Sequence, residues 1–148
     1  MIVREATAAD AQAMTALRAA SIRDLCAADH GDDPSEIASW IGPDDKFAKL
    51  IAQPELSLIV VEIDDEIAGL GGMSGDQILL NYVHPAFRAK GVSKTVMQAL
   101  ESRMVAQGIL VGHLCSTATA LPFYLSLGWV NAGPADAQKG QPMTKDLL

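Results

Sequence analysis

Three consecutive β-rich runs in the middle of the chain constrain the fold more than any other feature. Residues 56–63 (LSLIVVEI) and 66–74 (EIAGLGGMS) predict two strands, and Asp64-Asp65 between them predicts a hairpin turn. Residues 78–83 (ILLNYV) predict a third strand, which ends at His84-Pro85 because proline cannot donate to a sheet ladder. These three runs are therefore expected to form neighbouring strands of one sheet.

The rest of the chain alternates helical and extended patterns. We expect helices after the N-cap residues Thr7 and Asp33 and at 46–52, 93–106 and 118–127, and strands at 2–5, 109–115, 129–132 and 142–146. The chain has 148 residues, with no internal repeat or linker, and this length fits one domain. The prediction is a single α/β domain over residues 1–148 with a mixed sheet.

Charge and composition exclude several classes of protein. A formal net charge of −7 argues against a nucleic-acid binder and against docking on an anionic membrane. No apolar run approaches the roughly 20 residues that span a bilayer, and residues 1–10 lack the apolar region of a signal peptide. Two distant cysteines, Cys26 and Cys115, predict reduced thiols in the cytosol, and the histidine spacings indicate no metal site.

Positive charge is concentrated at one point of this acidic chain. The sequence has 11 Lys and Arg, and Arg88, Lys90 and Lys94 lie around Gly91, between a predicted strand and a predicted helix. The first turn of a helix has free N–H groups and a partial positive charge, and a glycine lets the main chain approach an anion. This arrangement predicts a phosphate-binding loop, although it is neither a P-loop nor a dinucleotide-binding Gly-x-Gly-x-x-Gly motif. The alternative is a solvated helix start with incidental lysines.

A second segment makes the interpretation more specific. Residues 83–93 read VHPAFRAKGVS, and residues 117–129 read TATALPFYLSLGW. These segments resemble the two signatures of the GNAT superfamily of acyl-CoA-dependent N-acyltransferases. The first signature is V-x-P followed by Q or R, then x-x-G-x and G or A. The second is N, S or T, then x-x-A-x-x-F-Y-x-x-x-G and F or W. The resemblance implies an α/β (α+β) fold with a mixed, mostly antiparallel sheet, one splayed strand pair and helices on both faces.

The resemblance also implies where a donor binds. The backbone amides of the loop would hold the pyrophosphate of acetyl-CoA, and Thr117 would also contact this co-substrate. The backbone of Tyr82 and Val83 would pair with the pantetheine arm as an added strand does. Ser93 stands where the family usually has Gly or Ala, and its hydroxyl is able to donate to a phosphate. The implied loop residues are Arg88, Ala89, Lys90, Gly91, Val92, Ser93 and Lys94.

The resemblance places Tyr124 where the family has the hydroxyl that protonates the departing thiolate. A phenol with an ordinary pKa of about 10 is protonated at neutral pH and can act as a general acid. The general base is unassigned, because residues 78–83 contain no carboxylate where many relatives carry one. Asn81 is expected either to contact the acceptor or to face solvent. His30 is either a base or acceptor ligand, or a solvated loop residue.

Three other residues are assigned structural roles. His84 is expected to shape the turn at Pro85, His113 to be a core residue of its strand, and Cys115 to be a buried thiol at the end of that strand. Residues 21–40 are expected to shape the acceptor site.

The sequence therefore predicts a cytoplasmic N-acetyltransferase that moves an acetyl group from acetyl-CoA to a primary amine by direct attack, with no metal. The acceptor is a small molecule or a peptide, and the protein is a monomer or a homodimer. The alternatives are a non-catalytic acyl-CoA-binding or interaction module on the same fold, and an enzyme that uses a different phosphate cofactor.

Overall fold

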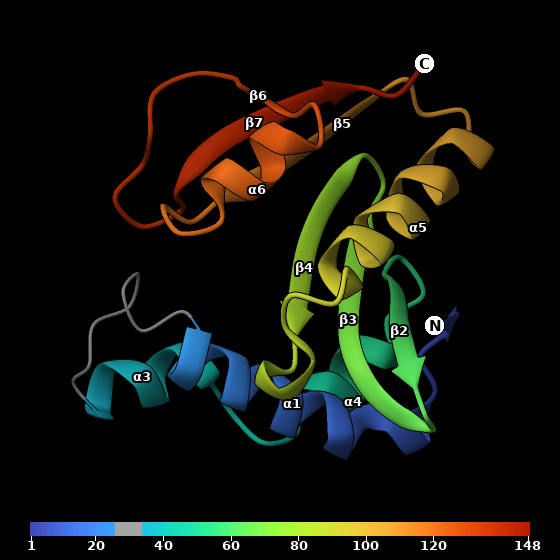
Figure 1. Ribbon diagram of the computed structural model, residues 1–148, viewed down its shortest axis with the longest axis vertical. Coiled ribbons are helices and arrows are strands. Elements are labelled where there is room, and N and C mark those ends of the chain that lie inside the picture. Colours follow the sequence, from blue (N-terminus) through green and yellow to red (C-terminus); the bar gives the residue numbers. More distant parts are fainter. Residues whose placement is uncertain (26–33) are drawn as a thin grey trace.

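The computed structural model describes residues 1–25 and 34–148, and its central feature is one mixed sheet (Figure 1). Within these residues the strand order is β1-β2-β3-β4-β5-β7-β6. All neighbouring strands run antiparallel except β4 and β5, which are parallel. The mixed, mostly antiparallel sheet is confirmed. The strands are β1 (Ile2–Glu5), β2 (Ser57–Ile63), β3 (Glu66–Ser74), β4 (Gln77–Val83), β5 (Val111–Ser116), β6 (Val130–Asn131) and β7 (Gln141–Asp146).

The helices follow the predicted order. They are η1 (Ala8–Asp10), α1 (Ala11–Leu25), α3 (Pro34–Ile41), α4 (Lys46–Ile51), η2 (Pro85–Phe87), α5 (Val92–Ala106) and α6 (Leu121–Ser126). The predicted end of the first long helix and the Asp33 cap lie outside the described residues. Nowhere in the described part of the chain does a helix combine the length and the apolar character that crossing a membrane requires.

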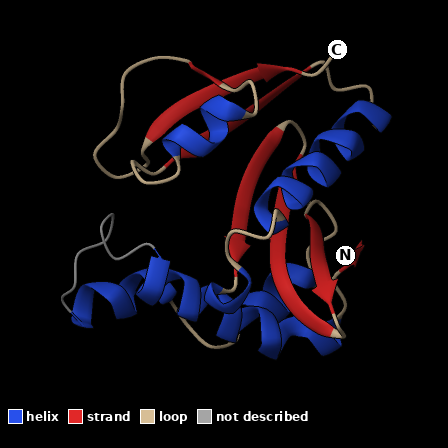
Figure 2. Ribbon diagram, in the orientation of Figure 1, coloured by secondary structure: helices blue, strands red, loops and turns tan. Residues whose placement is uncertain are grey.

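Strand β2 shows how the sheet separates two hydrophobic cores. Because successive side chains of a strand point to opposite faces, its four buried residues divide in pairs. Ile59 and Val61 pack in the core that contains α5 and α6, whereas Leu58 and Val60 pack in the core of α1 and α4. Helices therefore cover both faces of the sheet, as Figure 2 shows.

Two glycines of β3 allow α5 to lie directly against the sheet. A Cβ atom at Gly69 would stand 2.4 Å from Cγ1 of Val92, and one at Gly71 would stand 2.4 Å from Cγ1 of Val96. Both distances are far below the roughly 3.5–4.0 Å of a normal carbon–carbon contact. The missing side chains thus fix the height of α5 above the sheet, and with it the position of Val92 at the helix N-terminus.

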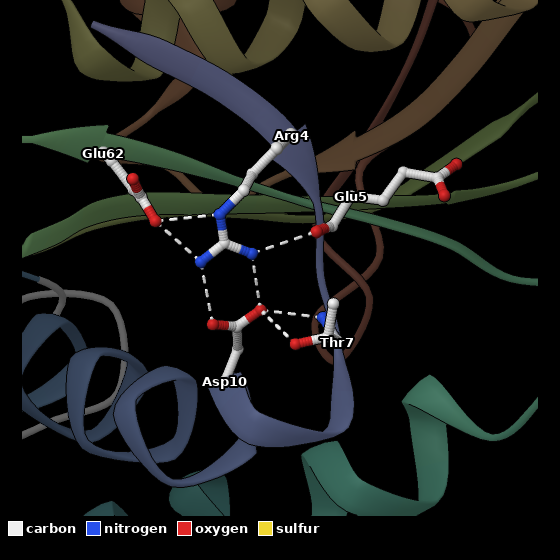
Figure 3. A network of polar contacts seen from close by, with 5 residues as sticks. All are labelled: Arg4, Glu5, Thr7, Asp10 and Glu62. Atoms are coloured by element: carbon white, nitrogen blue, oxygen red, sulfur yellow. Dashed lines mark hydrogen bonds and ion pairs between the residues drawn. The ribbon is translucent and has the colours of Figure 1, made fainter. Parts of the chain in front are cut away.

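A network centred on Arg4 ties β1 to its surroundings (Figure 3). The guanidinium of Arg4 donates through Nη1 and Nη2 to Asp10 at 2.8 and 2.9 Å, and through Nε to Glu62 at 2.8 Å. The backbone N–H of Thr7 donates to the same Asp10 carboxylate at 2.7 Å, which confirms Thr7 as the N-cap of this first turn. These donors, Arg4 first, lower the pKa of Asp10 to about 2.

Strands β4 and β5 part almost as soon as they meet. The only residue pair along these two described strands is Gln77, the first residue of β4, with His113, the third residue of β5. The N–H of His113 also donates to the carbonyl of Asp76 at 2.8 Å. Since the strands are parallel, they separate toward their carboxyl ends, and most of this edge of β4 has no partner strand. Figure 1 shows β5, β7 and α6 at the top of the view, apart from the lower half of β4. The predicted splayed pair is confirmed.

Candidate active site

The most distinctive contact of the separated strands joins β4 to α6. The Nδ2 amide of Asn81 donates a hydrogen bond to the Tyr124 hydroxyl oxygen at 3.2 Å. Tyr124 is buried, with 8% of its surface exposed, and its ring packs edge-on against Phe123 at 5.2 Å between centroids. The expected catalytic hydroxyl therefore lies opposite the unpaired half of β4.

Asn81 has a further polar atom at the same place. Its Oδ1 is buried and accepts no hydrogen bond from the described residues. A buried amide oxygen without a donor costs about 1–3 kcal/mol, so such an atom marks a place where a ligand donor would be stabilised. Of the two expectations for Asn81, plain solvent exposure is wrong.

The predicted phosphate loop follows β4 directly. The Nδ1 atom of His84 accepts from the backbone N–H of Ala86 at 3.1 Å, which confirms the turn role of His84 before η2. The loop then passes through Ala89 and Gly91, whose φ angles are +60° and +80°. The left-handed conformation of Gly91 turns the chain into α5, where glycine is favoured because it has no Cβ.

The N-terminus of α5 is the element of this loop that carries free backbone amides. Its first intrahelical bond runs from the N–H of Thr95 to the carbonyl of Gly91 at 3.0 Å, so the amides at 92–94 precede the helical ladder. The side chains of Arg88, Lys90 and Lys94 are exposed around it. The free amides and the three cations thus belong to the same loop after β4, and anion binding there stays a prediction.

Thr117 lies across the strand separation, at the end of β5. Its hydroxyl accepts from the N–H of Ala120 at 3.3 Å, and its carbonyl accepts from the N–H of Leu121 at 3.2 Å. This turn occupies residues 117–120, which is why α6 begins at Leu121 and not at 118 as predicted. The Thr117 side chain thus supports the helix that presents Tyr124.

The two strand residues assigned to the donor point their side chains away from the separation. Tyr82 packs in the core on the side of α1, and Val83 packs in the core on the side of α5. Both pair with β3, Tyr82 opposite Leu70 and Val83 opposite Gly69. Only their backbone is available on the outer edge of β4, and the pairing with a pantetheine arm that the resemblance implies stays a prediction.

Strand β5 corrects two predictions. Cys115 is exposed rather than buried, and the side chain of His113 is 44% exposed and lies 3.6 Å from the Asp76 carboxylate. Both residues project from the face of β5 opposite Leu114, which packs in the core with α5 and α6. His30 and Cys26 lie outside the described residues. Among the residues that are described, no three His, Cys, Asp or Glu gather as metal ligands would, and the expectation about metal stays a prediction.

Sequence reasoning missed Arg18. This residue of α1 is only 6% exposed, and its guanidinium carbon lies 5.4 Å from the centre of the Tyr82 ring. A signal was present, because position 18 falls on the apolar stripe of the helix with Met14, Leu17 and Ser21. A charged residue on such a stripe is unusual and indicates a specific role.

The arrangement has counterparts among known proteins. A sequence profile described as the Acetyltransferase (GNAT) domain matches residues 26–147. An acetyltransferase of Pectobacterium atrosepticum is 36% identical over 80 residues, which are 51% of this chain and 56% of that protein. The chain thus spans little more than half the length of this curated relative.

Solved structures share the fold across nearly the whole chain. A GCN5-related N-acetyltransferase from Rhodopseudomonas palustris superposes with a TM-score of 0.86 at 24% identity, covering 98% of this chain and 94% of the other. The PaiA N-acetyltransferase from Thermoplasma acidophilum, solved in complex with coenzyme A, gives 0.87 at 18% identity and covers 98% of both chains. The profile match, together with the splayed strands, the glycine loop and the buried tyrosine, shows that the chain belongs to the GNAT acetyltransferase family.

Proposed function

We propose that the protein is an N-acetyltransferase that moves an acetyl group from acetyl-CoA to a primary amine by direct attack. The observation that carries this proposal is the Asn81–Tyr124 hydrogen bond, at the level where β4 has lost its partner strand. It places a phenol beside an unpaired strand edge that leads straight into the basic loop. One end of the proposed site suits a thioester and the other suits a pyrophosphate.

Donor binding would use main-chain groups and three cations. The amides at 92–94 lie at the positive end of the α5 dipole, and Arg88, Lys90 and Lys94 add charge. The pantetheine arm would pair with the free edge of β4 at Tyr82 and Val83. Ser93 is half-buried in the first turn of α5, where its hydroxyl suits a phosphate oxygen. The similar PaiA structure holds coenzyme A, which supports this donor.

The chemistry follows from these positions. The amine nitrogen attacks the thioester carbonyl carbon, a backbone N–H of β4 stabilises the charge on the carbonyl oxygen, and the C–S bond breaks. The Tyr124 hydroxyl gives its proton to the departing sulfur, so that the thiol leaves neutral and the tyrosinate regains a proton from solvent. Water takes the proton that the amine releases, because β4 supplies no carboxylate.

Asn81 has two parts in this proposal. Its Nδ2 fixes the Tyr124 oxygen, so the hydroxyl hydrogen points away from Asn81. Its Oδ1 is buried without a donor from the described residues and suits an N–H of the attacking amine. The side-chain amide of Asn81 would thus hold both the general acid Tyr124 and the attacking amine. This positioning would accelerate the reaction in a site whose strand has no carboxylate to act as a base.

The test combines binding with turnover. Calorimetry is expected to show that coenzyme A binds, and a panel of primary amines is expected to include one that releases free thiol from acetyl-CoA. Tyr124→Phe should lower kcat by about a hundredfold, the contribution of one general acid, while the Kd for coenzyme A stays unchanged. Leu125→Ala is the matched control, because Leu125 is the next residue of α6 and is 47% exposed.

Two results would contradict the proposal in different ways. Binding of coenzyme A without turnover on any amine, and without an effect of Tyr124→Phe, would indicate a non-catalytic acyl-CoA-binding module. Absence of any heat with coenzyme A would remove the donor itself and would favour a different phosphate cofactor.

A further inference from the structure

A buried arginine on the opposite face of β4 has no role in the chemistry above. Arg18 is the one Lys or Arg among the described residues that is buried. Its Nη1 donates to the carbonyl of Ile41 at 2.5 Å, at the end of α3, and its guanidinium stacks over Tyr82. Its Nε is buried and has no hydrogen-bond partner among the described residues.

Among the described residues, no carboxylate balances the charge of Arg18. Other cations of this acidic chain do contact carboxylates, namely Arg4, Lys49, Arg103 and Lys145. No described carboxylate forms an ion pair with Arg18 or with Lys46. Burial, and then the positive charge of Arg18, lower the pKa of the Lys46 ammonium. Burying a cation without a counter-ion is costly, and a second cation beside it raises that cost, so the pair is suited to an anion.

The position of this pair relates it to the site. Tyr82, beneath Arg18, and Leu80 both pack on the α1 side of β4, whereas Asn81 between them reaches Tyr124 on the other side. Because β4 has no strand partner at this level, no backbone ladder separates the two faces of the sheet along its free edge. The donor would occupy one face and the acceptor would approach from the other.

An apolar pocket adjoins Lys46 on the same face. It has a volume of about 190 Å³ and is lined by Lys46 with residues of α4, β2, β3 and β4, including Leu50, Leu58, Leu79 and Leu80. A pocket of aliphatic side chains with a single ammonium suits a ligand that has an aliphatic group next to an anionic group.

We propose that the acceptor is an amine that also carries an anionic group, as an α-amino acid carries its carboxylate, and that Lys46 and Arg18 bind this group. An aliphatic side chain of the acceptor then occupies the leucine pocket, and its amino group points toward Asn81. This inference rests on the proposed acetyl transfer and adds the chemical class of the acceptor to it.

The experiment compares acceptors that differ only in the anionic group. Rates of thiol release from saturating acetyl-CoA are measured for L-leucine against L-leucinamide, and for L-methionine against L-methioninamide, with 1,5-diaminopentane as a cationic amine. For the unsubstituted protein, kcat/KM is expected to favour the acids. Lys46→Met should lower the acid-to-amide ratio by about tenfold, the worth of one charge-assisted hydrogen bond. The ratio is used because the intrinsic reactivities of the two amines cancel between variants.

Two further variants separate binding from stability. Lys49 lies three residues after Lys46 on the same short helix, and its side chain is 72% exposed. The acid-to-amide ratio of Lys49→Met should therefore stay at the wild-type value. Arg18→Lys keeps the charge but loses the planar donor, and it should lower the ratio while the Kd for coenzyme A is unchanged. If thermal denaturation shows that Arg18→Lys does not fold, the acid-to-amide ratio of Lys46→Met still tests whether the acceptor carries an anionic group.

The outcomes distinguish this inference from the proposed function. A ratio that Lys46→Met leaves unchanged, or turnover confined to the amides or the diamine, overturns the anionic acceptor and leaves acetyl transfer standing. Absence of turnover with every amine tested overturns both. A preference for the acids that Lys46→Met lowers and Lys49→Met does not lower supports the inference.

Discussion

A single methyl group added to β3 should weaken coenzyme A binding without touching the ligand. In Gly69→Ala the new Cβ would lie 2.4 Å from Cγ1 of Val92 and 3.3 Å from the carbonyl oxygen of Tyr82. Relief to a normal contact requires α5 to move by more than about 1 Å. Rotation of Val92 gives little relief, because a β-branched side chain in a helix has one strongly preferred rotamer.

The size of the loss in coenzyme A affinity follows from the position of the Val92 amide. It is the first residue of α5, and its amide is one of the donors proposed to hold the pyrophosphate. Hydrogen bonds form over a range of only about 2.7–3.2 Å, so a displacement of about 1 Å removes one. A charge-assisted bond is worth about 1.5–3 kcal/mol, which predicts a Kd for coenzyme A at least about tenfold weaker. Overpacking should also lower the free energy of unfolding by about 1–3 kcal/mol.

A second glycine of the same strand provides the control. In Gly72→Ala the new Cβ would lie 2.6 Å from Cδ2 of Leu58 and 3.2 Å from Cδ1 of Leu80, on the face away from α5. Calorimetric titration with coenzyme A, at a temperature where urea unfolding shows both variants folded, should find weaker binding only in Gly69→Ala. Equal affinities in the two variants would refute the claim that β3 sets the position of the phosphate loop.

Two further perturbations concern stability. The pKa of Asp10 is lowered from 3.8 to about 2. The stabilisation of the folded state by its carboxylate is therefore complete above the unfolded-state pKa and is lost as the pH falls through the folded-state pKa. Relative to Asp10→Asn, the wild type should lose about 2 kcal/mol of unfolding free energy over that acid range. Urea unfolding at several pH values measures this, and parallel curves for the two proteins would contradict it. Gly140→Ala should destabilise by more than about 2 kcal/mol, because its φ is +90° and the new Cβ would lie 2.3 Å from the carbonyl oxygen of Ser116. Gly133→Ala is the control, because Gly133 has a φ of +113° and a Cβ atom there would have no atom within 4 Å, so that only the conformational cost applies. If thermal denaturation showed equal losses of stability in Gly140→Ala and Gly133→Ala, the steric argument would be contradicted.

Local sequence patterns were sufficient where local physics decides the structure. The strand runs, the turn at His84 and the glycine at the start of α5 depend on neighbours in the chain, and the structure has them where they were predicted. Tyr124 was identified through the resemblance of residues 117–129 to a family signature, and the structure places its hydroxyl at the separated strands. Whether it is the catalytic acid stays a prediction.

Features that depend on what covers a surface were not predictable. The run VGHLC of β5 alternates, but alternation does not say which face is covered, so Cys115 and His113 were wrongly expected inside. The start of α6 depended on the Thr117 hydroxyl taking the first turn. Arg18 and Lys46, 28 positions apart in the sequence, come together only because α1 and α4 pack on the same face of the sheet.

The early parting of β4 and β5 has a thermodynamic consequence. Beyond Gln77 and His113 the two halves of the sheet are joined through packed side chains and not through a continuous ladder, so a pantetheine arm on the free edge would supply the missing strand. A small molecule would then be part of the architecture as well as a reactant. Its concentration would set how firmly the halves hold together, adding about 2.7 kcal/mol to the folding free energy at a hundred times its Kd.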